Sequence, residues 1–316
     1  MTGAAGYVGG VVVRRLLAEA DTAVIGVDAC EMPHGADGVR EIIDAPGLRF
    51  VRADVRDREA LRPLAAEADA VLHLAAVVGD PAGRRDPERT REINVEASRG
   101  LIELARDAGV GHFIFVSTCS NYGVADEGRL VTEDDELNPV SLYAETKVAV
   151  ERLLLDDPSF PSTCLRLATV YGAAPRMRFD LTVNQFTIEA LTEGVLSIYG
   201  EQFWRPYVHV EDVARAVSLV LATPERSVGR VFNVGDSGEN YTKRMMYELL
   251  KERLPDLRAE WVSVDEDPRS YKVSFERIRS ELGFETTWDV PSGMDQIIRL
   301  ARLGAFPDPG APRFRN

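Results

Sequence analysis

The feature that most constrains this chain is a glycine-rich stretch at its start, which has the pattern T-G-x-x-G-x-x-G from Thr2 to Gly9. Gly3 and Gly6 suit a tight turn in which the backbone approaches a bound group closely, and Gly9 suits close packing of a helix on a strand. Apolar residues recur at helical spacing over residues 8–20, so we expect the turn to open into a helix. The pattern is typical of a helix N-terminus that holds a phosphate group.

The segment after this helix indicates which group is bound. Residues 23–28 form a short apolar run that ends in Asp28, about 20 residues beyond the glycines. An acid at the end of the second strand accepts a hydrogen bond from a ribose 2′-hydroxyl and disfavours a 2′-phosphate. Glycines alone also fit a turn without a ligand, but together with Asp28 they predict a dinucleotide site with NAD rather than NADP as the cofactor.

One part of this unit is missing from the pattern. A glycine turn of this kind follows an apolar strand of about five or six residues. Here only Met1 precedes Thr2. The loss of that strand would leave unpaired backbone groups in the middle of the sheet. We therefore hypothesise that the natural chain begins several residues upstream.

Strand-like and helix-like segments alternate along the first half of the chain. Further strands are expected at residues 48–52, 69–76, 111–118 and 164–172, and long helices at residues 90–108 and 143–155. This alternation predicts an α/β protein with a Rossmann-type doubly wound parallel sheet, in which ligands lie at the carboxyl ends of the strands. The alternation weakens past Gly172. We expect residues 1–172 to form the NAD-binding domain and residues 173–316 to form mainly a smaller α/β substrate-binding lobe, with some segments returning to the first domain.

Composition and charge exclude several classes of function. The net charge of −14 disfavours nucleic acid or an anionic membrane as a partner. The three cysteines are too few for a disulfide framework, which together with the absence of a signal peptide predicts a cytoplasmic protein. The four histidines are scattered, and none is paired with a cysteine at zinc spacing, so no metal site is expected.

A tyrosine and a lysine lie four residues apart in the sequence. Tyr143 and Lys147 fall one turn apart on the expected helix, so both point the same way. Thr118 ends the strand expected at residues 111–118. A chance helical pair is common by itself, but the ends of parallel strands are where ligands lie.

Six motifs occur in one order along nearly the whole chain. They are the glycine turn, Asp54-Val55, His73-Leu74-Ala75-Ala76, S-T-C-S-N-Y-G from Ser117, Y-x-x-x-K from Tyr143 and R-P-Y-V-H-V-E-D from Arg205. In this combination and order the chain resembles the extended short-chain dehydrogenase/reductases, of the NAD-dependent nucleotide-sugar epimerase/dehydratase branch that includes UDP-glucose 4-epimerase.

The resemblance implies a catalytic mechanism residue by residue. Tyr143 looks like the general base that takes a proton from a sugar hydroxyl as hydride leaves for the nicotinamide. An unperturbed tyrosine has a pKa of about 10, and the positive charges of Lys147 and the nicotinamide would lower it. Lys147 would also hold the nicotinamide ribose, and the Thr118 hydroxyl would share the substrate proton. Asn94 is expected to be structural.

The resemblance also assigns residues to the two ligands. The expected cofactor contacts are Gly3, Gly6, Tyr7, Val8, Gly9, Asp28, Asp54, Val55, Leu74, Ala75, Ala76, Tyr143, Lys147 and Thr169. The expected contacts of the nucleotide-diphosphate sugar are Asp80, Cys119, Ser120, Asp180, Asn184, Tyr199, Arg205 and Arg269. Arg205 would clamp the pyrophosphate with its planar pair of donors, and Arg269 is a second clamp or a surface arginine. Tyr199 would stack on the nucleobase or pack in the core, and Asp80 would touch the sugar or form a turn.

Departures from the family pattern discriminate between its reactions. Family 4,6-dehydratases follow the catalytic threonine with an Asp-Glu pair, and the decarboxylases place a glutamate nearby. This chain has Cys119 and Ser120 at the dehydratase positions. Serine is a poor base at neutral pH, so dehydration is disfavoured. Cys119 is then either a packed small residue or an acid/base near the sugar.

The remaining Tyr, Lys and Thr chemistry favours an NAD-dependent epimerase that oxidises the sugar transiently at C-4. A nucleotide-sugar 4-ketoreductase or 4-dehydrogenase is the main alternative. A non-catalytic NAD-binding regulator would typically lack the Tyr-Lys pair, and a reductase of lipid-like or phenolic carbonyls would not need a pyrophosphate clamp. The family's habit of pairing two long helices, here residues 90–108 and 143–155, predicts a homodimer.

Overall fold

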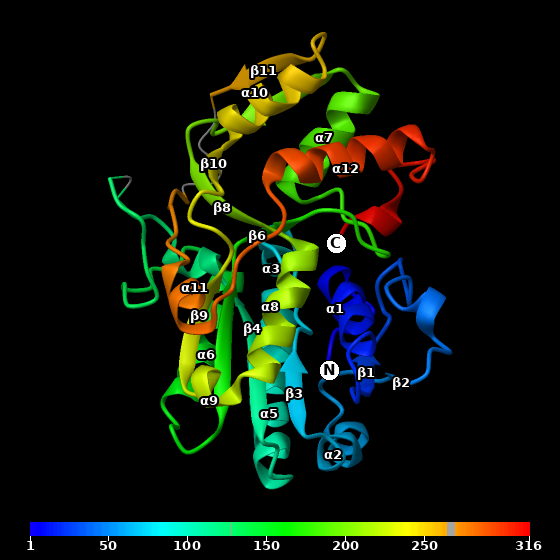
Figure 1. Cartoon of the computed structure of the whole chain (residues 1–316), viewed down its shortest axis with the longest axis vertical. Helices are drawn as coiled ribbons and strands as arrows, with labels where there is room; N and C mark the ends of the chain where they lie inside the picture. Colours follow the sequence, from blue (N-terminus) through cyan, green and yellow to red (C-terminus); the bar gives the residue numbers. More distant parts are fainter. Residues whose placement is uncertain (127, 264–268) are drawn as a thin grey trace.

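Figure 1 shows the computed structural model of the chain, which describes residues 1–126, 128–263 and 269–316, and the backbone alone for residues 80–82. A large parallel sheet with helices on both faces forms one half, and a smaller α/β lobe forms the other. The expected α/β class with a Rossmann-type doubly wound sheet is therefore confirmed. Within the described ranges, no helix is long and apolar enough to cross a membrane.

The large sheet contains strands from both halves of the chain. Its spatial order is β2 (Leu48–Arg52), β1 (Val24–Asp28), the pair Met1 and Thr2, β3 (Ala70–His73), β4 (His112–Thr118), β5 (Ser162–Leu167) and β9 (Arg230–Val234). Every pairing in it is parallel. The carboxyl ends of its strands therefore meet at one edge, which faces the smaller lobe (Figure 1).

Met1 and Thr2 stand where a first strand was expected. Thr2 pairs with Val27 of β1 and His73 of β3, and the Thr2 amide donates to the Leu72 carbonyl at 3.0 Å. The Met1 ammonium group donates to the Ile25 carbonyl at 2.8 Å, and burial lowers its pKa to about 6. Two residues thus join β1 to β3, and the upstream start stays a hypothesis.

Helices cover the large sheet on both faces. On one face, α1 (Tyr7–Leu17) packs against α8 (Val210–Ala222), with α9 (Pro224–Ser227) and α11 (Glu276–Leu282) nearby. On the other face, α2 (Arg58–Ala66), α5 (Ser98–Asp107) and α6 (Leu142–Leu155) pack on β3, β4 and β5. Apolar side chains of α1 and α8 recur every three or four residues, which places them in one buried stripe.

The smaller lobe has its own core. Its sheet has the order β10 (Asn240–Thr242), β8 (Trp204–His209), β6 (Thr169–Tyr171), and β7 (Val195–Tyr199) pairs in parallel with β11 (Arg258–Val262). The helices α7 (Thr182–Thr192), α10 (Lys243–Arg253) and α12 (Val290–Arg302) pack on them. The remaining short elements are η1 (Arg40–Ile42), α3 (Asp80–Arg85), α4 (Pro87–Arg91), η2 (Glu92–Ala97), η3 (Cys119–Tyr122) and η4 (Pro312–Phe314).

Two predicted elements are divided in the structure. The strand expected at residues 164–172 breaks at Ala168, because β5 stays in the large sheet while β6 pairs with β8 of the smaller lobe. The helix expected at residues 90–108 becomes α4, a π-helical turn (η2) and α5. The π-helical turn presents Asn94, whose side chain bonds both backbone groups of Val77 and the Thr146 hydroxyl. Asn94 therefore has the structural contacts expected of it.

Candidate active site

A cavity of about 730 Å³ opens at the carboxyl ends of the large sheet, between the sheet and the loops that lead into the smaller lobe. All the residues predicted to contact the cofactor line it: Gly3, Gly6, Tyr7, Val8, Gly9, Asp28, Asp54, Val55, Leu74, Ala75, Ala76, Tyr143, Lys147 and Thr169. The predicted catalytic Thr118 lines it as well. Residues from one end of the sheet thus converge on one cavity, as expected for a doubly wound fold.

The glycine turn leaves room that side chains would fill. Gly3 has φ +73°, and a Cβ added there would lie 2.9 Å from the Ala75 amide nitrogen. A Cβ on Gly9 would lie 1.9 Å from the Gly3 carbonyl oxygen. Gly6 precedes α1 and brings no capping side chain, so the first amides of this helix face the cavity without a side-chain acceptor. This cradle fits the pyrophosphate of a dinucleotide.

Asp28 is fixed beside the glycine turn. Its carboxylate accepts hydrogen bonds from the Ala5 amide at 3.0 Å and the Cys30 amide at 2.9 Å, while burial raises its pKa. Both amides hold the carboxylate at the cavity wall, where a ribose hydroxyl fits. Further along the wall, Asp54 pairs with Arg56 at 2.7 Å, and this bond holds the pKa of Asp54 below its usual value.

Tyr143 and Lys147 come from the first turns of α6, which begins after the capping hydroxyl of Ser141. The Lys147 ammonium donates to the Val116 carbonyl at 2.8 Å and lies 5.9 Å from the centre of the Tyr143 ring. Burial lowers the pKa of Lys147 to about 8, and the negative charge of Glu151 opposes that shift. A cation so close to Tyr143 stabilises the phenolate form of the phenol.

Thr118 and its two neighbours point in different directions. The Thr118 hydroxyl accepts a hydrogen bond from the Ser120 amide at 3.1 Å at the start of η3, and both residues line the cavity. Cys119 lies outside the cavity, 1% exposed, with its thiol 3.2 Å from the Arg166 carbonyl. Burial raises the pKa of this thiol well above its usual value. Of the two roles expected for Cys119, this burial favours the packed small residue, because η3 turns its side chain into the core.

The other predicted substrate residues do not reach this cavity in the structure. Asn184 is buried and bonds the Gly172 amide and the Arg178 carbonyl, and Asp180 pairs with Arg178 at 2.7 Å. Both residues support the loop after β6 in this structure, and their contact with the substrate stays a prediction. Tyr199 ends β7 with 42% of its surface exposed.

Asp80 begins α3, and its side chain lies outside the described part of the structure.

Arg205 and Arg269 lie together behind one cavity-lining tyrosine. The Arg205 guanidinium bonds the carbonyls of Trp204 and Arg269 and lies 5.2 Å from the centre of the Tyr271 ring. Tyr271 lines the cavity, and its hydroxyl donates to Ser120 at 3.4 Å. The two predicted clamps are thus adjacent to the wall of the cavity rather than part of it.

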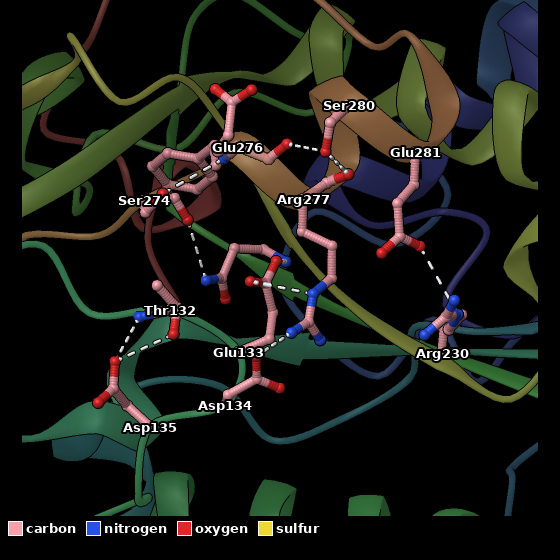
Figure 2. Close-up of polar contacts among 12 residues, drawn as sticks. Thr132, Glu133, Asp134, Asp135, Arg230, Ser274, Glu276, Arg277, Ser280 and Glu281 are labelled. Carbon is pink, nitrogen blue, oxygen red and sulfur yellow. Dashed lines mark hydrogen bonds and ion pairs between the residues drawn. The ribbon is translucent and has the colours of Figure 1, made fainter.

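Tyr271 is held by the segment before α6. The Val131 amide donates to the Lys272 carbonyl, and the Val131 carbonyl accepts from the Ser274 amide, both at 2.8 Å. Figure 2 shows how this segment is anchored, since Arg277 of α11 reaches Asp134 at 2.5 Å and Glu133 at 3.6 Å. These contacts place Tyr271 opposite Ser120.

Among the cavity residues that were not identified from the sequence are Tyr271, Arg176 and Arg178. The two arginines follow β6 in the run P-R-M-R, just past the carboxyl end of a strand. Two cations at that place were the available signal, because ligands of this fold lie at strand ends. Tyr271 had no such signal, because its position depends on pairing with a segment about half a chain away.

A comparison with protein families identifies the family of the chain. The model of the family described as "NAD dependent epimerase/dehydratase family" matches residues 1–235. This chain belongs to that family. Its members are NAD-dependent enzymes that act on nucleotide sugars, so the cofactor predicted from Asp28 and the glycine turn is confirmed.

Individual relatives cover nearly the whole chain. A dTDP-glucose 4,6-dehydratase of Streptomyces griseus is 31% identical over 94% of this chain and 92% of its own. The dTDP-glucose 4,6-dehydratase DesIV of Streptomyces venezuelae, solved with NAD bound, superposes with a TM-score of 0.84 at 28% identity over 96% of both chains. A UDP-glucose 4-epimerase of Thermotoga maritima, solved with UDP-glucose, has the same TM-score and identity over 96% of this chain and 98% of its own. Dehydratases and epimerases are therefore equally similar in fold.

Proposed function

We propose that this protein is a nucleotide-sugar epimerase that oxidises the sugar transiently at C-4. Its substrate would be a nucleotide-diphosphate sugar, as for the relatives solved with UDP-glucose or UDP-glucuronic acid. The convergence of Tyr143, Lys147 and Thr118 on the NAD cavity supports redox chemistry at a sugar hydroxyl. Pairing of two copies through α5 and α6 stays a prediction.

Each catalytic side chain has a task that its surroundings support. The Lys147 charge favours the Tyr143 phenolate, which takes the proton of the C-4 hydroxyl. The Thr118 hydroxyl holds the same substrate oxygen and shares its proton. Bound NAD supplies a hydride acceptor that can also return the hydride. After the 4-keto sugar turns over in the cavity, Tyr143 gives its proton back to the oxygen.

The observation that carries the choice of epimerase is the pair of residues after Thr118. A 4,6-dehydratase needs an acid for the C-6 hydroxyl and a base for the C-5 proton, and here Cys119 is buried and Ser120 bonds Tyr271. Burial raises the pKa of Tyr271, so its hydroxyl stays protonated and is no base. The described carboxylates that line the cavity come from the end of β1, from the loops after β1 and β2 and from the residue before α4, and none of them comes from β4, η3 or α6.

The test is incubation of the purified protein with UDP-glucose, UDP-glucuronic acid or dTDP-glucose in D₂O, followed by NMR of the product. An epimerase yields the C-4 epimer with hydrogen retained at C-5, because the C-5 bond never breaks. A dehydratase yields a 4-keto-6-deoxy sugar with deuterium at C-5, and that product would overturn the proposal. Turnover that consumes one added NAD or NADH per sugar would instead identify a 4-dehydrogenase or 4-ketoreductase.

A further inference from the structure

One buried cation in the cavity wall forms no ion pair with any carboxylate in the part of the chain that the structure describes, although the charges of Asp180 and Asp37 act on it from a distance. Arg176 follows β6 and is 2% exposed, and its Nε lacks any hydrogen-bond partner. Its Nη2 donates to the Arg315 carbonyl and to the Asn316 side chain, both of them neutral acceptors. Neighbouring Arg178, by contrast, donates two hydrogen bonds to the Asp180 carboxylate, at 3.0 and 2.7 Å.

The surroundings of Arg176 place it beside the glycine turn. Its charge is felt by Tyr7 at the start of α1, by Asp28 at the end of β1 and by His34 in the loop that follows. Arg176 lines the same cavity as Gly6, Tyr7 and Asp28. The guanidinium therefore faces the region between the ribose acceptor Asp28 and the N-terminus of α1.

The C-terminal segment fixes the guanidinium in this position. Figure 1 shows this segment next to the N-terminal end of α1, and Asn316 itself lines the cavity. Phe314 packs against Phe179, whose amide donates to the Phe314 carbonyl at 2.8 Å. Arg313 pairs with Asp37 in the loop after β1. The backbone carbonyl of Arg315 is thereby held where it orients Arg176.

A buried charge that is not hydrogen-bonded to a carboxylate is unfavourable. Burial together with the charge of Arg178 lowers the pKa of Arg176 to about 10, and the charges of Asp180 and Asp37 only partly oppose that shift. The N-terminus of α1, an eleven-residue helix, also favours an anion at the same place. A group that carries two negative charges could neutralise the Arg176 guanidinium and also accept hydrogen bonds at the N-terminus of α1.

We propose that Arg176 is a clamp for the pyrophosphate of NAD, supplied by the loop after β6 and oriented by the C-terminal segment. This inference rests on the NAD site used in the proposed function and adds a residue outside the glycine turn. A 2′-phosphate fits this place less well, because the Asp28 carboxylate would repel it. The pyrophosphate of the sugar nucleotide is expected at the other end of the cavity, near Tyr271 and Arg205.

The test compares Arg176→Gln and Arg176→Lys with the matched control Arg178→Gln in cofactor-free full-length protein. Calorimetric titrations with NAD, ADP, adenosine, NADP and UDP-glucose report equilibrium binding without turnover. Loss of one charge-assisted contact weakens NAD and ADP binding about 10- to 100-fold in Arg176→Gln. We expect an intermediate loss in Arg176→Lys and unchanged adenosine binding. Arg178→Gln should stay near wild type, because Arg178 is already neutralised by Asp180.

Several outcomes overturn the proposal. NAD and ADP binding within twofold of wild type in Arg176→Gln would exclude the clamp, and a loss confined to UDP-glucose or NADP would assign Arg176 to a different phosphate. An equal loss in Arg178→Gln would show a general effect of positive charge. The melting temperature of cofactor-free Arg176→Gln should equal or exceed that of wild type, which separates lost binding from misfolding. Failure to epimerise with intact NAD binding would disprove the proposed function and leave the clamp standing.

Discussion

The two ends of the cavity are built in different ways. At the cofactor end, backbone groups form the wall, and two amides already hold the Asp28 carboxylate in place. At the substrate end, the side chain of Tyr271 contributes to the wall, and behind it the Arg205 guanidinium bonds backbone carbonyls. A wall of backbone is rigid before the ligand arrives, whereas long side chains must exchange partners to bind one. We therefore expect substitutions at the cofactor end to act through sterics and those at the substrate end through single contacts.

The largest effect is expected for Gly9→Ala. The new Cβ would lie 1.9 Å from the Gly3 carbonyl oxygen, and its three nearest atoms all belong to the backbone of Gly3 and Ala4, which cannot move aside as a flexible side chain can. Binding of NAD should be lost in calorimetric titrations, with a lower melting temperature. Gly111→Ala is the matched control, since its Cβ would meet the Asp69 carbonyl oxygen at an ordinary 3.4 Å. Normal NAD binding by Gly9→Ala would show that the glycine cradle is not rigid.

Tyr143→Phe tests the place where the cofactor end and the substrate end of the cavity meet, beside Tyr143 and Lys147. The variant lacks the hydroxyl that exchanges the substrate proton, so turnover should fall about 100- to 10,000-fold, the usual contribution of a general base. NAD affinity should stay within about threefold of wild type, because the ring still packs beside Lys147. Turnover and binding are measured on the same preparation. Wild-type turnover in this variant would remove Tyr143 from the mechanism.

The lowered pKa of Lys147, which lies between the two ends of the cavity, makes the free energy of unfolding depend on pH. Its folded pKa of about 8 lies below the ordinary 10.5, so unfolding takes up a proton between these values. The free energy of unfolding of the cofactor-free protein should therefore rise by about 3 kcal/mol from pH 8 to 10.5, and fall back as the pH drops through 8. Urea titrations across this range measure it, with Lys147→Met as the control in which this contribution disappears. If both proteins showed the same dependence of unfolding free energy on pH, Lys147 would not have a lowered pKa in the folded protein.

The same contrast explains what could be predicted from sequence. The glycine turn and Asp28 were identified because a backbone-lined site demands particular residues at a particular spacing. Arg176 was missed because its orientation depends on Arg315 and Asn316, which come together with it only in the folded chain. The role of Cys119 was left open between packing and acid/base chemistry because its place after Thr118 does not fix its direction, and only the turn of η3 shows that its side chain points inward.

The strand predicted at residues 164–172 was wrong for a related reason. The apolar run from residue 164 to 172 is continuous, and its division into β5 and β6 reflects a change of partner strand at Ala168. Periodicity alone carries no information about which strand pairs with which. The segments most open to error thus lie where the large sheet passes into the smaller lobe.

Arg205→Ala tests the substrate end. Removal of a planar cation near Tyr271 should raise the KM for the sugar nucleotide about tenfold and leave kcat and NAD affinity unchanged. Arg205→Lys keeps the charge but not the planar pair of donors, so an intermediate KM is expected. Steady-state kinetics with a nucleotide sugar and calorimetry with NAD provide the two readouts. A matching loss of NAD affinity would show that the two ends are not independent.

The smallest effect is expected for Cys119→Ala, which lies just behind the boundary between the two ends. The buried thiol lies 3.2 Å from the Arg166 carbonyl and 3.9 Å from Asn233 Oδ1, neither of which lines the cavity, so its removal leaves a small void in the core. The free energy of unfolding should fall by about 1 kcal/mol, while kcat stays within about twofold of wild type. A drop in kcat of tenfold or more with an unchanged melting temperature would restore the acid/base alternative. It would also mean that η3 rearranges when the sugar binds and that substrate binding changes the position of residues packed behind the cavity, such as Cys119.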